Sequence, residues 1–130
     1  MSKPKILIVD DEADVRETIE FCLAAAGYEV QTADNGLEGL GMVRAQPPDL
    51  AILDVMMPGE NGYRVAKMIR EDEAASGSSS RMPIILLTAR DLSGDPEREQ
   101  MFMDFSQADR MMYKPFNIDS LLSEVGDLLH

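Results

Sequence analysis

The sequence predicts a single α/β domain: a doubly wound, five-stranded parallel sheet with helices on both faces. Short apolar runs and amphipathic segments alternate five times along the 130 residues. Several apolar runs are continuous, which is typical of strands buried on both sides. The chain is the size of one domain, and its 45% hydrophobic residues allow a sizeable core. Regular alternation of strand and helix favours a parallel sheet with right-handed crossovers.

The first half of the chain supplies three strands and two helices. The strands are expected at 5–9, 28–33 and 50–54, and the helices at 14–27 and 35–46. Gly27 is well placed to end the first helix in a left-handed conformation. The second strand reads as more exposed than the others. Gly39 and Gly41 are expected to weaken the second helix, because glycine costs about 1 kcal/mol relative to alanine in a helix.

The second half repeats the alternation. The helices are expected at 62–74, 96–107 and 117–130, and the strands are "MPIILLTA", which ends at Thr88, and "RMMY" at 110–113. Pro96 suits the first turn of its helix, and Asn117 or Asp119 is expected to cap the last one. The composition of "SGSSS", residues 76–80, predicts a flexible linker.

Composition excludes several classes of function. The net charge is -12, and no basic run exceeds a pair, which argues against direct binding to nucleic acid or to an anionic membrane. Cys22 is expected to be a packed apolar group, and the single histidine, His130, makes Cys–His catalysis and a histidine zinc site poor candidates. The sequence shows neither an apolar run of membrane-spanning length nor a signal peptide, so a cytoplasmic protein is expected.

Polar residues follow four of the predicted strands. Asp10 and Asp11 follow the first strand, Asp54 ends the third, Thr88 ends the fourth and Lys114 follows the fifth. The carboxyl ends of parallel strands meet at one edge of the sheet, which is where ligands of such folds bind. Crowded carboxylates repel one another, and Mg²⁺, which prefers oxygen ligands, removes that repulsion. An aspartate can accept a phosphoryl group as a covalent nucleophile, and a lysine and a hydroxyl suit the charge of that group. The sequence therefore predicts a magnesium-dependent phosphoryl site centred on Asp54.

Four segments, "KILIVDDE", "LAILDVMMPGENG", "PIILLTA" and "YKPF", together resemble the response regulator receiver domain of two-component signalling, the CheY-like family. The resemblance covers essentially residues 1–130 as one receiver domain. It implies the flavodoxin-like strand order 2-1-3-4-5. It also implies a phosphorylation-dependent switch that catalyses only its own phosphorylation and dephosphorylation. The implied donor is a phosphohistidine on a sensor histidine kinase or a histidine phosphotransfer protein, and the implied output is an unnamed protein or effector domain.

The resemblance also implies roles for individual residues. Asp54 would be phosphorylated, and Mg²⁺ would be bound by Asp11, Asp54 and the backbone carbonyl of Met56, with Asp10 acting through a metal-bound water. Thr88 would hydrogen-bond the phosphoryl group and Lys114 would pair with it. Ala89 would leave room for the donor, Pro58 and Gly62 would belong to the loop after the acceptor, and Arg90 would tune hydrolysis together with Met56.

The sequence departs from the family at Met111, where an aromatic residue is usual, and in the length of the segments on either side of Thr88. The methionines Met101, Met103, Met111 and Met112, with Phe102 and Phe105, are expected to be core, although an adaptable partner surface is the alternative.

Three other functions are disfavoured. A hydrolase would need a second acid where Met56 stands, an inactive docking module would not keep all five chemical positions, and a dinucleotide binder would carry a glycine-rich turn after the first strand.

Overall fold

The fold is a five-stranded parallel sheet in the order β2-β1-β3-β4-β5, as predicted. The computed structural model describes residues 3–57, 59–77, 80–89, 92 and 94–130. The elements are β1 (Lys5–Val9), α1 (Ala13–Ala25), β2 (Glu29–Ala33), α2 (Gly36–Ala45), β3 (Leu50–Asp54), α3 (Gly62–Ser76), β4 (Ile84–Thr88), α4 (Pro96–Ser106), β5 (Arg110–Tyr113) and α5 (Ile118–Leu129). No helix in the described part of the chain has both the length and the apolarity needed to cross a membrane.

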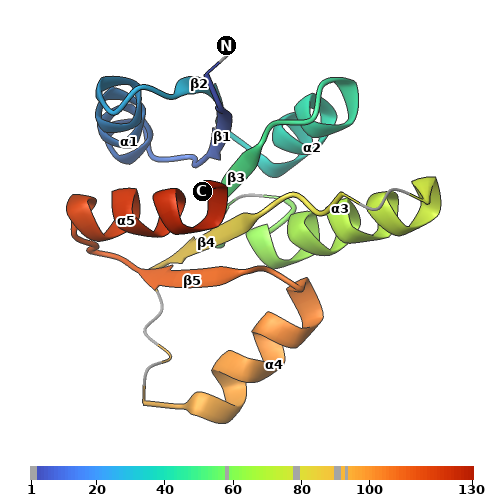
Figure 1. Ribbon diagram of the computed structural model, residues 1–130. Helices are drawn as coiled ribbons and strands as arrows, with labels where there is room; N and C mark the ends of the chain where they lie inside the picture. Colours follow the sequence, from blue (N-terminus) through green and yellow to red (C-terminus); the bar gives the residue numbers. More distant parts are fainter. Residues whose placement is uncertain (1–2, 58, 78–79, 90–91, 93) are drawn as a thin grey trace.

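The two faces of the sheet carry separate cores. Helices α1 and α5 cover one face, and α2, α3 and α4 lie against the other (Figure 1). Every residue of β3 and β4 is buried, whereas β2 is mostly half-exposed at its edge of the sheet. The continuous apolar runs therefore belong to the central strands, as their pattern predicted.

Helix boundaries follow local chemistry, with small differences from the prediction. Gly27 follows α1 with φ of 101°, and Asn117, rather than Asp119, caps α5 by accepting hydrogen bonds from two backbone amides. Helix α3 continues through Ser76 and Gly77 ends it in the left-handed conformation, so these two residues do not belong to the predicted linker, and Ser78 and Ser79 lie outside the described residues. Helix α4 ends at Ser106, one residue earlier than predicted, and the following residue, Gln107, has a positive φ of 56° without being glycine.

The two glycines of α2 have different surroundings. A Cβ atom on Gly39 would lie 2.6 Å from Cγ2 of Val9, whereas a Cβ on Gly41 would meet nothing within 4 Å. Gly39 therefore allows α2 to pack directly on β1, and only Gly41 carries the cost of glycine without a packing contact.

Helix α4 is the least buried helix. Ser106 is its only buried residue within the described part of the chain. Phe102 is half-buried and stacks on Tyr63 with ring centroids 4.4 Å apart, and Met103, Met111 and Met112 pack against the two cores. Met101 and Phe105, however, are 56% and 40% exposed, so their prediction as core residues was wrong. Both side chains lie on the exposed side of α4, because a surface helix buries only the face that packs against the rest of the protein.

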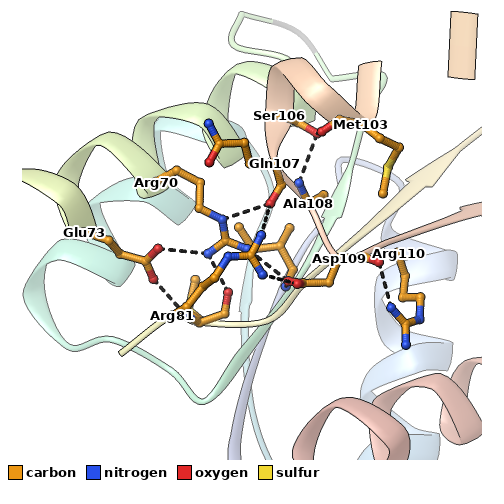
Figure 2. A network of polar contacts seen from close by, with 11 residues as sticks. Arg70, Glu73, Arg81, Met103, Ser106, Gln107, Ala108, Asp109 and Arg110 are labelled. Atoms are coloured by element: carbon orange, nitrogen blue, oxygen red, sulfur yellow. Dashed lines mark hydrogen bonds and ion pairs between the residues drawn. The ribbon is translucent and has the colours of Figure 1, made fainter. Parts of the chain in front are cut away.

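A cluster of charged residues, which we call the arginine cluster (Arg70, Glu73, Arg81 and Asp109), ties α3 to the turn between α4 and β5 (Figure 2). Arg70 is buried and donates to Asp109, Glu73 and the backbone carbonyls of Met82 and Gln107 at 2.7–3.0 Å. Asp109 also accepts a hydrogen bond from the backbone amide of Ile84, the first residue of β4. The cluster therefore lies at the amino end of β4, at the opposite edge of the sheet from the predicted site.

Candidate functional site

The predicted site residues meet at the carboxyl edge of the sheet. Asp10 directly follows β1, Asp54 and Thr88 are the last residues of β3 and β4, and Lys114 directly follows β5. Asp10, Asp54 and Thr88 are buried. The strand ladder places Asp54 beside Leu87, one residue before Thr88, and the backbone amide of Lys114 donates to the Thr88 carbonyl at 2.8 Å. Four strand ends thus bring together residues that are up to 104 positions apart in the sequence.

Lys114 is surrounded by carboxylates. Its Nζ atom lies 3.1 Å from Oδ2 of Asp10, 3.1 Å from Oε1 of Glu12 and 3.4 Å from Oδ1 of Asp54. Burial lowers the pKa of Lys114, but hydrogen bonds to Asp10 and Glu12 and the charge of Asp54 outweigh it, so the net shift is upward. The ammonium group is therefore a fixed positive charge beside Asp54. The Lys114–Pro115 peptide bond is cis.

The two carboxylate oxygens of Asp54 differ. Oδ1 faces Lys114 and accepts a long hydrogen bond, 3.4 Å, from the backbone amide of Met56. Oδ2 is buried and has no hydrogen-bond partner among the described residues. Burial and the negative charge of Asp10 raise the pKa of Asp54 to about 7, against the opposing effect of Lys114. A buried carboxylate with an unpaired oxygen gains stability from a cation or from a covalent partner.

Asp10, Asp11, Glu12 and Asp54 form a cluster that could hold a metal ion. One carboxylate oxygen from each lies within 4.8 Å of the others. An all-oxygen set of carboxylates suits a hard divalent cation such as Mg²⁺. The buried Oδ2 atom of Asp54, which has no hydrogen-bond partner among the described residues, is a second observation that these residues fit such an ion.

Glu12 was missed by the sequence analysis, which assigned roles only to the two aspartates before it. The signal was present in the motif "DDE" at residues 10–12. Its contact with Lys114, 102 positions away, was not visible from the sequence.

The loops around the site are described in part. Ala89 is exposed and, with Glu12 and Lys114, lines a cavity of about 550 Å³. A Cβ atom on Gly62 would lie 2.5 Å from the backbone oxygen of Asp54, so a close approach explains this glycine. Pro58 and Arg90 lie outside the described residues.

Met111 of β5 stands where the family usually has an aromatic residue. Met111 packs into the core shared by α2, α3 and α4, and Met112 packs into the core on the other face. This alternation puts Tyr113 on the same side as Met111. The Tyr113 hydroxyl donates a hydrogen bond to Glu99 of α4.

Comparisons with known proteins agree with this geometry. The family model of the response regulator receiver domain matches residues 6–126. Response regulator MprA of Mycobacterium tuberculosis is 37% identical over 125 residues, 96% of this chain and 50% of the relative. The DNA-binding dual master transcriptional regulator RpaA of Synechocystis is 35% identical over 126 residues, 97% of this chain and 49% of the relative. The chain thus spans about half the length of the curated relatives it matches.

Solved structures give the same result. Chemotaxis response regulator CheY4 of Vibrio cholerae superposes with a TM-score of 0.85 at 32% identity, over 98% of this chain and all of the other. The response regulator TrrA of Thermotoga maritima, solved in complex with Mg²⁺ and BeF, has a TM-score of 0.79 at 38% identity, over 97% of this chain and 99% of the other. With the family model covering nearly all of its residues and the acids and lysine gathered at the expected edge of the sheet, this chain belongs to the response regulator receiver domain family.

Proposed function

We propose that Asp54 accepts a phosphoryl group from a phosphohistidine, in a Mg²⁺-dependent reaction that switches this domain between two signalling states. The observation that carries the proposal is the environment of Asp54. Its Oδ2 atom is buried and unpaired, while the Lys114 ammonium lies 3.4 Å from Oδ1. A nucleophilic oxygen free of hydrogen bonds beside a fixed positive charge suits attack on an anionic phosphoryl group.

In the proposed transfer, Oδ2 of Asp54 attacks phosphorus and forms the new O–P bond. The P–N bond of the phosphohistidine breaks, and the imidazole leaves with that electron pair and takes up a proton. Lys114 would neutralise charge on the phosphoryl oxygens, and Thr88, one residue beyond the partner of Asp54 in the ladder, would donate a hydrogen bond to them. Hydrolysis by water then returns free phosphate and the Asp54 carboxylate.

Asp10, Asp11, Asp54 and the carbonyl of Met56 would hold the ion. When bound, Mg²⁺ would neutralise the acids and the phosphoryl oxygens. Support comes from the cluster of carboxylates and from the TrrA structure, which was solved in complex with Mg²⁺ and BeF.

The partners follow from the same chemistry. We propose that residues 1–130 form one receiver domain in the cytoplasm and that a sensor histidine kinase or a histidine phosphotransfer protein is the donor. The output partner reads a change in shape. An aspartyl phosphate adds about -1.5 to -2 charges at the strand edge, which favours one of two packings of the surrounding elements. The domain catalyses only its own phosphorylation and dephosphorylation.

The test is incubation with Mg²⁺ and acetyl phosphate, followed by intact-mass measurement. We expect the mass to increase by one phosphoryl group in the wild type. Asp54→Asn is expected to abolish the increase, and the exposed Asp127→Asn on α5 serves as the matched control that retains it. Absence of the increase with every small donor and with phosphorylated kinase would refute the proposal, and multiple turnover of a phosphomonoester would indicate a hydrolase instead.

A further inference from the structure

Glu12 occupies the position where a residue normally caps α1, yet its side chain makes no hydrogen bond to that helix. The other four helices have side-chain caps, which accept hydrogen bonds from backbone amides. The capping residues are Asn35, Asn61, Asp95 and Asn117. Short polar side chains suit this position, and glutamate is not among the preferred residues. Glu12 therefore supplies no capping hydrogen bond to α1.

The Glu12 carboxylate is directed at Lys114 instead. Its Oε1 lies 3.1 Å from Nζ, while the Glu12 backbone amide donates to Oδ1 of Asp10 at 2.9 Å and fixes the backbone. The Glu12 side chain is 61% exposed, whereas the carboxylates of Asp10 and Asp54 on the inner side of Lys114 are buried. The ammonium group therefore lies between two inner carboxylates and a single outer one.

Phosphorylation would change this balance. A phosphoryl group on Asp54 attracts the ammonium inward with a charge of about -1.5 to -2. The phosphoryl group on Asp54 would also lie beside Asp10, so Lys114 could contact the phosphoryl group without leaving these two carboxylates. Glu12 is the one partner among the described ion pairs of Lys114 that draws Nζ toward solvent.

We propose that Glu12 is a positioning residue that competes with the acceptor Asp54 for the Lys114 ammonium in the unphosphorylated domain and so slows phosphoryl transfer. The proposal rests on the function proposed above. Glu12 and Lys114 both line one cavity together with Ala89, so their ion pair lies at the surface beside the carboxyl end of β4. A partly exposed ion pair is weak, and breaking it corresponds to a rate change of about 1.5- to 5-fold.

The experiment compares Glu12→Gln with the wild-type full chain. Initial rates of phosphorylation by acetyl phosphate are measured at saturating Mg²⁺, and the Mg²⁺ dissociation constant is measured separately. We expect Glu12→Gln to raise the saturated rate about 1.5- to 5-fold, with unchanged Mg²⁺ affinity and a smaller effect at high salt. Glu12→Asp, whose carboxylate is one methylene shorter, is expected to fall between the two.

Asp14→Asn is the matched control. Asp14 is exposed, belongs to the first turn of α1 and lines the same cavity, so its change removes one negative charge without touching the ion pairs of Lys114. We expect the rate of this variant to equal that of the wild type. As a second readout, Glu12→Gln is expected to bind beryllofluoride, a phosphoryl mimic, more tightly by a similar factor.

Three results would overturn the inference while leaving the proposed function intact. These are an unchanged or lower rate in Glu12→Gln, an equal rise in Asp14→Asn, and weaker Mg²⁺ binding with an unchanged saturated rate. The last would make Glu12 a metal ligand rather than a positioning residue. A wild type that takes up no phosphoryl group from any donor overturns both proposals.

Discussion

Replacing Gly39 and Gly41 of α2 by alanine, one at a time, is expected to change stability in opposite directions. Alanine gains about 1 kcal/mol over glycine in a helix interior at either position. At Gly41 nothing lies within 4 Å of the new methyl group, so we expect this full gain in the free energy of unfolding.

At Gly39 the same gain meets a clash. The new methyl group would lie 2.6 Å from Cγ2 and 3.2 Å from Cγ1 of Val9, whose side chain is fully buried. Inserting a methyl into a packed core costs about 1–3 kcal/mol. Net destabilisation by Gly39→Ala is therefore about 0–2 kcal/mol. The difference between the two variants is about 1–3 kcal/mol and does not depend on the helix propensity that they share.

The assay is urea unfolding followed by far-ultraviolet circular dichroism, since the chain has no tryptophan. The midpoint is expected to shift without a change in the m-value. Val9→Ala removes both clashing methyl groups, so in that background Gly39→Ala is expected to lose its destabilising effect. If Gly39→Ala stabilises the wild type as much as Gly41→Ala does, the close packing of α2 on β1 is refuted.

Three further predictions concern the site and the arginine cluster. Burial raises the pKa of Asp54 from 3.8 to about 7, so without Mg²⁺ its contribution to stability is fully present below pH 3.8 and is lost as the pH rises through 7. Asp54→Asn is expected to remove this part of the pH dependence of stability, measured by calorimetry. Gln107→Gly relieves a left-handed φ of 56° and is expected to stabilise the fold by about 1 kcal/mol in urea titrations, and no gain would refute the strain. Arg70→Met leaves the Asp109 charge and two backbone carbonyls with fewer partners and is expected to cost about 3–5 kcal/mol; a loss under 1 kcal/mol would show that the cluster stabilises little.

The sequence predicted the strands, the helices and the edge of the site because these depend on local patterns, whereas the strand order came from the family resemblance. Apolar runs identified the buried strands, and the polar residue after each run identified the carboxyl edge of a parallel sheet. Asp10, Asp54, Thr88 and Lys114 lie where this reasoning placed them.

What the sequence did not predict depends on contacts between distant residues. The arginine cluster joins residues 39 positions apart, and the ion pair of Glu12 joins residues 102 apart, so no local pattern indicates them. Gly39 reads as a helix-weakening residue until its approach to Val9 is known. Met101 and Phe105 are apolar, but α4 covers too little of the sheet to bury them.

The way α4 is attached has a consequence for how the domain opens. Its last residue is buried and the carbonyl that follows it, on Gln107, is held by Arg70 and Arg81, whereas no residue of its first two turns is buried. We expect amide hydrogen exchange to begin at the amino end of α4 and to reach its carboxyl end last. Helix α4 can therefore lose its hydrogen bonds turn by turn from its amino end while its carboxyl end stays attached, and this local opening does not require the sheet to unfold.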